Sequence, residues 1–391
     1  MRTQVGIVGA GPAGLLLSHL LHREGISSVV LEARSRAYVE KRVRAGVLEH
    51  GTVETLRAAG VAHRLQREGL IHHGIELRFG GARHRIGFEE LVPGRVITVY
   101  GQQEVVKDLV AARLAAGGDI RFEVQEVALS GIEGERPRLQ FTAAGDRQTI
   151  ECDYIAGCDG FHGVCRDAIP AGALTRFERE YPFAWLGILA HVAPSADELI
   201  YAYGESGFAL HSMRSAEISR FYLQVAADAQ IESWPNERIW AELRSRLETV
   251  SGFSLADGPL IEKNITPMRS FVVEPMQYGR LYLAGDAAHI VPPTGAKGLN
   301  LAIADVRVLT RALAAWYAGR DREGLAQYSA TCLRRVWRAQ HFSYWMTTLL
   351  HTFETDDAYA RRLQLAYLEY VVSSRAAATT LAENYVGWEE P

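Results

Sequence analysis

One stretch near the N-terminus decides the expected fold: Gln4-Val5-Gly6-Ile7-Val8-Gly9-Ala10-Gly11-Pro12-Ala13-Gly14. Its apolar first half predicts a buried strand, and its glycines predict a tight turn into a helix over residues 12–23. Gly25 ends that helix, and the apolar run Ser28-Val29-Val30-Leu31 predicts a second strand. Together these elements indicate a βαβ unit, which is typical of Rossmann-like folds.

The glycines of this unit follow the G-x-G-x-x-G pattern of dinucleotide-binding proteins. Gly9 permits the turn, Gly11 lets the backbone approach a pyrophosphate, and Gly14 lets the helix pack on the strand. The start of the helix adds unpaired N–H groups and a favourable dipole. Glu32 ends the second strand, where a contact to a ribose hydroxyl is expected. The unit therefore predicts a bound nucleotide rather than an incidental glycine-rich turn, but it does not separate FAD from NAD.

Length and charge narrow the class of protein. The 391 residues are too many for one small domain and suit two or three lobes. Basic residues number 42 and acidic residues 46, so the formal net charge of −4 gives no reason to expect nucleic acid or an anionic membrane as a partner. No stretch approaches the roughly 20 apolar residues of a membrane-spanning helix. We expect a globular, cytoplasmic protein.

The cysteines suggest neither a metal site nor a disulfide framework. There are four, Cys152, Cys158, Cys165 and Cys332. None has the short paired spacing of a zinc site, and cysteine is too sparse to hold a small disulfide-rich fold. We expect buried, reduced thiols and no bound metal.

The middle of the chain predicts a second, antiparallel sheet. Strand patterns follow one another there, at Trp185–His191, Glu198–Tyr203, Phe208–Met213 and Arg220–Val225. A helix is expected over residues 236–247, and a later buried strand over residues 280–284 leads into Gly285-Asp286. The last ninety or so residues are expected to be helical.

Because the two kinds of sheet alternate along the sequence, we predict a mixed α/β protein with discontinuous domains. A Rossmann-like cofactor lobe is assigned to residues 1–72, 100–180 and 268–335. An antiparallel-sheet substrate lobe is assigned to residues 73–99 and 181–267, and C-terminal helices at an interface to residues 336–391.

Two further motifs follow predicted strands, Cys158-Asp159-Gly160 and Gly285-Asp286. With the nucleotide unit and the longer runs 42–49 and 269–300, they closely resemble the class A flavoprotein monooxygenases, and among these the hydroxybenzoate hydroxylases. The resemblance runs nearly end to end, through Glu383-Asn384-Tyr385-Val386-Gly387. It implies that the nucleotide is FAD, and that no metal is needed because a flavin carries the oxygen chemistry.

The resemblance also implies which residues contact FAD, besides the three glycines and Glu32. These are Arg44, Gln102, Asp159, Asp286, Leu299 and Asn300, with Arg220 helping to govern the position of the flavin. Asp286 has a physical case of its own, since a carboxylate at the carboxyl edge of a parallel strand lies where doubly wound folds bind ligands. A helix-capping aspartate without a ligand is the alternative, and the local sequence favours neither.

The last two predicted strands of the second sheet outline a pocket. Alternation puts Ser212 and Arg214 on one face and Arg220 and Tyr222 on one face of the partner strand. Arginine can bind a carboxylate through two hydrogen bonds, although a solvated sheet face is the commoner reading of such a pattern. The resemblance assigns Ser212, Arg214 and Tyr222 to a substrate carboxylate. His211 departs from the family, and alternation turns it to the other face, so we expect no catalytic role for it.

By the same resemblance, Tyr201 and Tyr385 contact a substrate phenol and pass its proton towards His72. A phenolate ring attacks an electrophilic flavin hydroperoxide better than a neutral phenol does, so hydrogen bonds that favour ionisation promote hydroxylation. Without the resemblance these would be two half-buried tyrosines, and His72 with its neighbour His73 a surface pair. Pro293 and Thr294 are expected to face substrate and flavin through a loop whose Pro-Pro pair also makes it rigid.

The electron donor must bind without a second G-x-G-x-x-G unit. The resemblance suggests Arg42, His162 and Arg269 for its phosphates, and Tyr38 with Arg34 nearby for a 2′-phosphate. Position 33 is Ala rather than a basic residue, which departs from strongly NADPH-specific members. We expect NADPH, with NADH also accepted, and O2 as co-substrate.

The reaction implied is hydroxylation of 4-hydroxybenzoate at C3 to 3,4-dihydroxybenzoate. Two alternatives stay open: another hydroxybenzoate as substrate (the 3-hydroxy or 3,4-dihydroxy acid), or a flavin-binding redox sensor without turnover. The aromatic residues of the C-terminal helices, Phe342, Tyr344, Trp345 and Met346, suggest self-association but suit a core equally well. The dimers of the family favour a homodimer.

Overall fold

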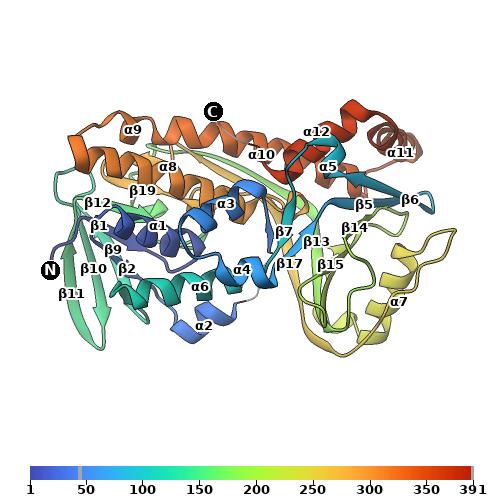
Figure 1. Ribbon diagram of the computed structural model, residues 1–391, viewed down its shortest axis with the longest axis horizontal. Helices are drawn as coiled ribbons and strands as arrows, with labels where there is room; N and C mark the ends of the chain where they lie inside the picture. Colours follow the sequence, from blue (N-terminus) through green and yellow to red (C-terminus); the bar gives the residue numbers. More distant parts are fainter. Residues whose placement is uncertain (43–45, 389–391) are drawn as a thin grey trace.

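The computed structural model describes residues 1–42 and 46–388, which form a mixed α/β fold of two lobes (Figure 1). One lobe contains a sheet with the strand order β18-β19-β12-β1-β2-β8. Its strands are β1 (Val5–Val8), β2 (Ser28–Leu31), β8 (Asp119–Arg121), β12 (Tyr154–Gly157), β19 (Leu281–Leu283) and β18 (Gln277–Tyr278). All pairings are parallel except that of the edge strand β18. The predicted first strand therefore lies inside a Rossmann-like sheet.

Helix α1 (Pro12–Arg23) begins directly after the glycine turn. Pro12 suits the first turn, where its missing N–H would have no helical partner, and Gly25 ends the segment with a φ of +71°. The helix packs against α6 (Gln102–Ala115) and α8 (Gly298–Gly319). Its leucines are buried in the core of this lobe. The glycine turn is thus held between a buried strand and a buried helix.

The second sheet has eight strands in the order β20-β17-β13-β16-β15-β14-β5-β6. Their bounds are β5 (Gly74–Phe79), β6 (Ala82–Gly87), β13 (Thr175–His191), β14 (Leu199–Ala202), β15 (Ala209–Met213), β16 (Ile218–Ala226), β17 (Leu260–Glu274) and β20 (His289–Ile290). Strands β13 and β17 pair antiparallel over most of their length and run from one lobe into the other (Figure 1). They connect the two lobes physically.

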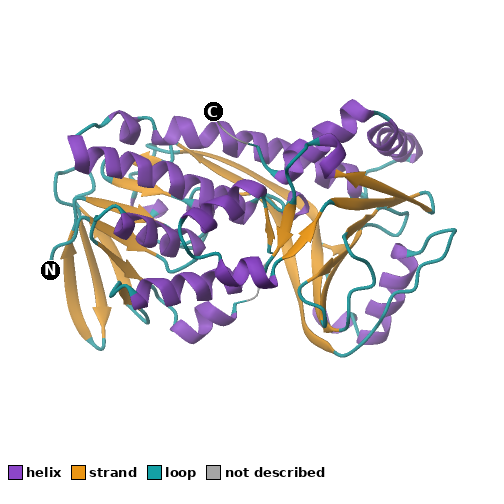
Figure 2. Cartoon of the chain, viewed as in Figure 1, coloured by secondary structure: helices purple, strands orange, loops and turns teal. Residues whose placement is uncertain are grey.

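The remaining elements surround these sheets. Two three-stranded sheets consist of β9 (Gln125–Ser130), β10 (Arg138–Ala143) and β11 (Asp146–Glu151), and of β3 (Val47–Leu48), β4 (Leu70–His72) and β7 (Ile97–Val99). The other helices are α2 (Arg36–Lys41), α3 (His50–Ala58), α4 (His63–Glu68), α5 (Phe88–Leu91), α7 (Asn236–Leu247), α9 (Glu323–Ala326), α10 (Tyr328–Leu350), α11 (Ala358–Ser373) and α12 (Arg375–Val386). Figure 2 shows the long helices along one side of both lobes. Within the described ranges, no helix is long and apolar enough to cross a membrane.

The eight-stranded sheet buries both of its faces. One face carries Leu77, Tyr201 and Leu210 and packs against the C-terminal helices α10, α11 and α12; we name it the pocket face. The rear face carries Ile200 and Phe221 and packs against α7. Side chains on the pocket face therefore point into a space that the C-terminal helices close.

Most expected elements are present with small shifts, and some were not expected. The strand predicted over residues 198–203 spans 199–202, and the helix predicted over 236–247 has those bounds. Helices α3 and α4 were not predicted, and β13 begins at Thr175, ten residues before its predicted start. The added part of β13 is mostly exposed and rich in charge, so it lacks the apolar alternation by which strands are recognised.

Buried histidines predict how stability depends on pH. Burial lowers the pKa of His72 and of His211 to about 4, and that of His351 to about 3. In the unfolded chain each titrates near 6.5, so the unfolded state takes up protons first as the pH falls. Stability from the neutral rings is complete above about pH 6.5 and is lost as the pH falls towards 4. We expect the free energy of unfolding to drop by about 1 kcal/mol per histidine between about pH 7.5 and 5.5.

Urea unfolding of the wild type and of His211→Phe at both pH values measures this drop. The variant lacks one of these rings, so its pH-dependent loss should be smaller by about 1 kcal/mol. An identical loss in both proteins would contradict the assignment of His211 as a buried neutral ring.

Candidate active site

The glycine turn has the geometry that a pyrophosphate requires. Gly9 has a φ of +102°, and a Cβ added there would lie 2.3 Å from the Cys158 carbonyl oxygen. A Cβ on Gly14 would lie 2.0 Å from the Gly9 carbonyl oxygen, so the close approach of helix and strand excludes any side chain. A Cβ on Gly11 would meet nothing within 4 Å. The middle glycine therefore faces open space at the start of α1, where a phosphate group can approach the backbone.

Glu32 supports this turn from the end of β2. Its Oε2 accepts a hydrogen bond of 2.8 Å from the Ala10 N–H, and its Oε1 accepts one of 2.8 Å from the Arg34 N–H. The side chain is half-buried, and each oxygen retains a further lone pair. The predicted ribose-binding carboxylate is thus fixed in place beside the glycine turn.

The Gly285-Asp286 motif lies at the carboxyl edge of the same parallel sheet. Gly285 follows β19 with a φ of +64°, and its N–H donates to Asp305 Oδ2 at 3.0 Å. The same oxygen lies 2.7 Å from His289 Nε2. Burial opposes the charged imidazole, yet the Asp305 carboxylate outweighs burial and raises the pKa of His289. This buried pair shapes the loop that carries Asp286, whose side chain is exposed at the sheet edge.

The other predicted FAD residues are placed less uniformly. Asp159 Oδ2 accepts from the Cys165 N–H at 2.9 Å, while its buried Oδ1 has no hydrogen-bond partner among the described residues, and burial raises its pKa. Gln102 is the half-buried first residue of α6. Arg44 lies outside the described residues.

Asn300 binds within the protein rather than facing outward. Its Oδ1 accepts from the Glu49 N–H at 2.9 Å, and its Nδ2 donates to the carbonyl oxygens of Val47 and Ala296 at 3.0 and 2.8 Å. The side-chain amide therefore ties β3 to the start of α8. The neighbouring Leu299 is half-buried against the core.

On the pocket face, the register brings the predicted substrate residues together. Tyr201 lies opposite Leu210, which lies opposite Tyr222 on the next strand. Ser212 lies opposite Arg220. As alternation predicts, His211 lies on the rear face; its Nε2 accepts from the Ser195 N–H at 3.1 Å.

The arginine end of the pocket is polar and buried. Arg214 Nη1 donates to Ser212 Oγ at 2.9 Å and to the Met213 carbonyl oxygen at 2.8 Å. Its Nε is buried without a hydrogen-bond partner in the described chain, and burial lowers the pKa of the guanidinium. Arg220 Nε donates to the Tyr222 hydroxyl at 3.1 Å. A half-buried guanidinium whose Nε–H is buried and unsatisfied is suited to an anionic ligand such as a carboxylate.

Gly187 of β13 leaves the room that this end requires. It lies opposite Tyr222, and a Cβ there would lie 3.0 Å from Arg220 Nη2. The same Cβ would lie 3.3 Å from the Tyr222 ring, so a side chain at this position would require both neighbours to shift. The strand that connects the lobes therefore also shapes the floor of the pocket.

Tyr201 of β14 and Tyr385 of α12 hydrogen-bond to each other through their hydroxyls, and each is only 1% exposed. Burial raises the pKa of both phenols, so both are neutral at physiological pH. Tyr385 is also held by its backbone, since Lys297 Nζ donates to its carbonyl oxygen at 3.1 Å.

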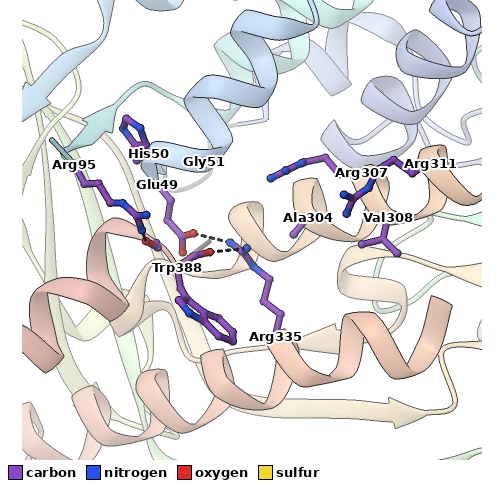
Figure 3. Close-up of a pocket in the computed structure, with 11 residues that line it drawn as sticks. Glu49, His50, Gly51, Arg95, Ala304, Arg307, Val308, Arg311, Arg335 and Trp388 are labelled. Carbon is purple, nitrogen blue, oxygen red and sulfur yellow. Dashed lines mark hydrogen bonds and ion pairs between the residues drawn. The ribbon is translucent and has the colours of Figure 1, made fainter. Parts of the chain in front are cut away.

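A buried ion cluster lies behind Tyr385. Glu49 accepts from Lys297 Nζ at 2.7 Å and from Arg335 Nη2 at 2.8 Å. Figure 3 shows Glu49 and Arg335 facing each other, with Arg95 and Trp388 beside them. Burial lowers the pKa of Lys297, and the Glu49 carboxylate opposes that shift.

His72 is buried, so the surface-pair alternative is wrong for it. Only 1% of it is exposed, whereas His73 is exposed and pairs with Glu89 at 2.7 Å. Both ring nitrogens of His72 lack a hydrogen-bond partner among the described residues, so no direct bond joins it to Tyr201 or Tyr385.

The loop with Pro293 and Thr294 is held by α10. Pro293 is exposed and starts a short 3₁₀ turn over Pro293–Gly295, and Ala296 follows with a φ of +54°. Thr294 Oγ1 lies 2.9 Å from Thr347 Oγ1 and is fully buried. The loop is therefore anchored on one side and open on the other.

The predicted donor residues form two groups. The guanidinium carbons of Arg34 and Arg42 lie 5.4 and 6.0 Å from the centre of the Tyr38 ring. In the other group, the centre of the Phe161 ring lies 5.0 Å from the centre of the His162 ring and 4.8 Å from the guanidinium carbon of Arg269. Arginine beside an aromatic face can bind phosphates and rings. In the second group, Arg269 also forms ion pairs with Glu178 and Glu180 at 3.7 and 3.5 Å.

Comparisons with known proteins agree with this geometry. A family model described as an FAD binding domain matches residues 2–343. The p-hydroxybenzoate hydroxylase of Acinetobacter baylyi is 51% identical over 387 residues, which cover 99% of this chain and 96% of that protein. The chain belongs to the p-hydroxybenzoate hydroxylase family. The glycine turn, Glu32 and the exposed Asp286 fit FAD, the cofactor of this family.

Solved structures share the fold of this hydroxylase family member. The p-nitrophenol 4-monooxygenase of Pseudomonas putida has a TM-score of 0.84 and 19% identity, and the match covers 100% of both chains. The anhydrotetracycline hydroxylase of Streptomyces rimosus has a TM-score of 0.77 and 22% identity, covering 99% of this chain and 76% of that one. In the described part of this hydroxylase-family chain, no three His, Cys, Asp or Glu side chains cluster as metal ligands.

Several residues that build the site were not predicted. Glu49 and Lys297 occur in motifs that resemble the hydroxylase family, but their pairing was not anticipated. Trp185 and His351 form a buried hydrogen bond of 2.7 Å beneath the pocket. For the Glu49–Lys297 pair, the one feature of the sequence that could have indicated a buried charge was Lys297 itself, a single lysine after the mostly apolar residues 290–296.

The glycine geometry predicts different outcomes for two matched substitutions in this p-hydroxybenzoate hydroxylase family member. Gly11→Ala adds a methyl group into open space, so the apoprotein should keep its stability while FAD binding weakens. Gly14→Ala forces apart helix and strand, which costs about 1–3 kcal/mol in the free energy of unfolding. Urea unfolding of apoprotein and FAD titration separate the two effects. Equal stability loss in both variants would contradict the different roles of the two glycines.

Proposed function

We propose that this chain hydroxylates 4-hydroxybenzoate at C3 to give 3,4-dihydroxybenzoate, using NAD(P)H and O2. The observation that carries the proposal is one sheet face with two receptors. One is Arg214, whose buried Nε–H is unsatisfied, beside Ser212; the other is the hydrogen-bonded pair Tyr201 and Tyr385. A para-substituted acid has its two polar groups at opposite ends of a ring, which suits such a site. Bound FAD would supply the redox and oxygen chemistry.

The arginine end would hold the substrate carboxylate. The unsatisfied Nε–H of Arg214 would donate to a carboxylate oxygen, and the Ser212 hydroxyl, 2.9 Å from Arg214 Nη1, would share it. The Tyr222 hydroxyl, which accepts from Arg220 on the neighbouring strand, would add a further contact. Because the site is shielded from water, these bonds would be stronger than in water. A ligand without a carboxylate would leave the guanidinium N–H unsatisfied. This end therefore selects an anion and orients the ring.

The tyrosine pair would ionise the substrate phenol. A proton from the phenol can pass to the Tyr201 oxygen while the Tyr201 proton passes to the Tyr385 oxygen and Tyr385 releases its own proton, so that both tyrosines end neutral. We propose that the proton continues from Tyr385 towards His72, whose buried ring nitrogens have no partner among the described residues. Burial lowers the pKa of His72 to about 4, so it would pass the proton on rather than retain it.

The electron donor would be NADPH, with NADH accepted. The cationic group around Tyr38 supports binding of a 2′-phosphate by Arg34 and Arg42, and the group around Phe161 supports binding of the pyrophosphate by His162 and Arg269. Ala33 in place of a basic residue weakens the preference for the phosphate.

The test is oxidation of NADPH and NADH in air by the purified FAD protein, with and without 4-hydroxybenzoate, and identification of the product. We expect strong stimulation by the substrate and 3,4-dihydroxybenzoate as product. Stimulation with peroxide alone would mean that the acid is an effector and another hydroxybenzoate the substrate. No stimulation would favour a flavin sensor.

Tyr201→Phe serves as the variant within this assay. Its substrate should still stimulate NADPH oxidation, but product formed per NADPH should fall by roughly tenfold or more, because the phenol loses its proton acceptor. Fully coupled turnover in the variant would contradict the role of the tyrosine pair.

We also propose a homodimer in solution. Phe342 and Met346 are buried in the core and Trp345 is half-buried, so they do not support it. The support comes from exposed aromatic residues nearby, Tyr344 on α10 and Tyr359, Tyr367 and Tyr370 on α11. Light scattering should give about twice the 43.3 kDa chain mass, and a mass of one chain would contradict the proposal.

A further inference from the structure

His351 follows helix α10 and is completely buried among aromatic rings. Its imidazole stacks on Phe183 and Phe208, with ring centres 4.6 and 4.4 Å away. Its Nε2 accepts from the indole N–H of Trp185 at 2.7 Å, and its Nδ1–H donates to the Thr347 carbonyl oxygen at 2.9 Å. These two bonds use both ring nitrogens and select one tautomer.

The ring does not take part in proton transfer. Burial lowers the pKa of His351 to about 3, so it is neutral throughout the physiological range. Neither nitrogen bonds to Tyr201, Tyr385 or His72. Any role in the reaction must therefore come from what the ring holds in place.

On one side, His351 holds the wall of the pocket. The Trp185 ring, to which it is bonded, lies 4.8 Å from the Tyr222 ring, and Phe208 lies 6.1 Å from the Tyr201 ring. Trp185 and Tyr222 occupy neighbouring strands on the pocket face. The imidazole thus supports one side chain next to each end of the pocket.

On the other side, His351 belongs to the segment that holds the Pro293–Gly295 loop. Thr347, whose carbonyl accepts from His351, lies 2.9 Å from Thr294 through its hydroxyl. Thr352, the residue after His351, is bonded to Gln224 of the pocket sheet. Gln224 Nε2 donates to the Thr352 carbonyl oxygen at 2.6 Å, and Gln224 Oε1 accepts from the Thr352 N–H at 3.1 Å. The end of α10 therefore contacts both the sheet and the loop.

We propose that His351 is a positioning residue that sets the pocket wall, through Trp185 and Tyr222, at a defined distance from the loop that carries Pro293 and Thr294. The inference rests on the proposed hydroxylation. If the wall shifts relative to the loop, the substrate ring moves away from the place where oxygen is delivered, and electrons reach oxygen without hydroxylating the ring.

The test compares three variants of the FAD protein. His351→Phe keeps an aromatic ring but removes both hydrogen bonds, and His351→Gln keeps an acceptor for the Trp185 N–H. His211→Phe is the matched control, because it alters another fully buried histidine, one that lies on the rear face of the eight-stranded sheet. Each is assayed for the dissociation constant of 4-hydroxybenzoate, read from the flavin absorbance change, and for product formed per NADPH.

We expect His351→Phe to weaken binding about tenfold and to lower product per NADPH several-fold. His351→Gln should recover much of both, and His211→Phe should match the wild type in both, whatever its thermal stability. If His351→Phe matches His211→Phe while the wild type forms 3,4-dihydroxybenzoate, the positioning role is overturned and the proposed function stands. If the wild type forms no product, the proposed function fails, and this inference fails with it.

Discussion

A single buried carboxylate, that of Glu49, joins the segments that meet behind the candidate pocket. It is bonded at once to Lys297 before α8 and to Arg335 on α10, and Lys297 in turn holds the backbone of Tyr385. A buried charge that is left unpaired is destabilising. Removing one partner of a buried ion pair therefore typically lowers the free energy of unfolding by about 3–5 kcal/mol. The same carboxylate excludes a side chain at Gly387, because a Cβ there would lie 2.4 Å from Glu49 Oε2. The position of Tyr385 in the tyrosine pair therefore depends on the ion pairs of Glu49.

The long strands β13 and β17 impose a second constraint. They belong to the pocket sheet at one end and reach the cofactor lobe at the other, and they stay paired along this length apart from irregularities between Glu180 and Ala184 and between Leu189 and Ala190. A shift of either lobe would therefore displace both strands. Gly187 lies on one of these strands beneath Arg220 and Tyr222, and Arg269 lies on the other next to the Phe161 ring. The pocket floor and a candidate donor contact are thus built on the same pair of strands.

The parts of this structure that follow from local pattern could be predicted from the sequence. The glycine turn, Glu32 and the alternation of Ser212, His211 and Tyr222 are set by neighbours a few positions away, so periodicity and spacing were sufficient. The pairing of Tyr201 with Tyr385 came only from resemblance to a family. Contacts such as Glu49 with Lys297, or Trp185 with His351, join residues 248 and 166 positions apart, and no local pattern records which partner tertiary packing will choose. Helices α3 and α4 were missed because they are short, 9 and 6 residues long, and contain few apolar residues.

Tyr385 lies in α12, late in the sequence, and this has a consequence for how the molecule folds. Its hydroxyl meets that of Tyr201 across 184 positions of sequence, and α12 packs over a sheet whose strands were synthesised much earlier. Pairings of such high sequence separation pay their loop-closure entropy late and slow the folding of a domain. A nascent chain must therefore expose the apolar pocket face until α12 emerges, and during that interval the unfinished pocket is a site for chaperone binding or aggregation.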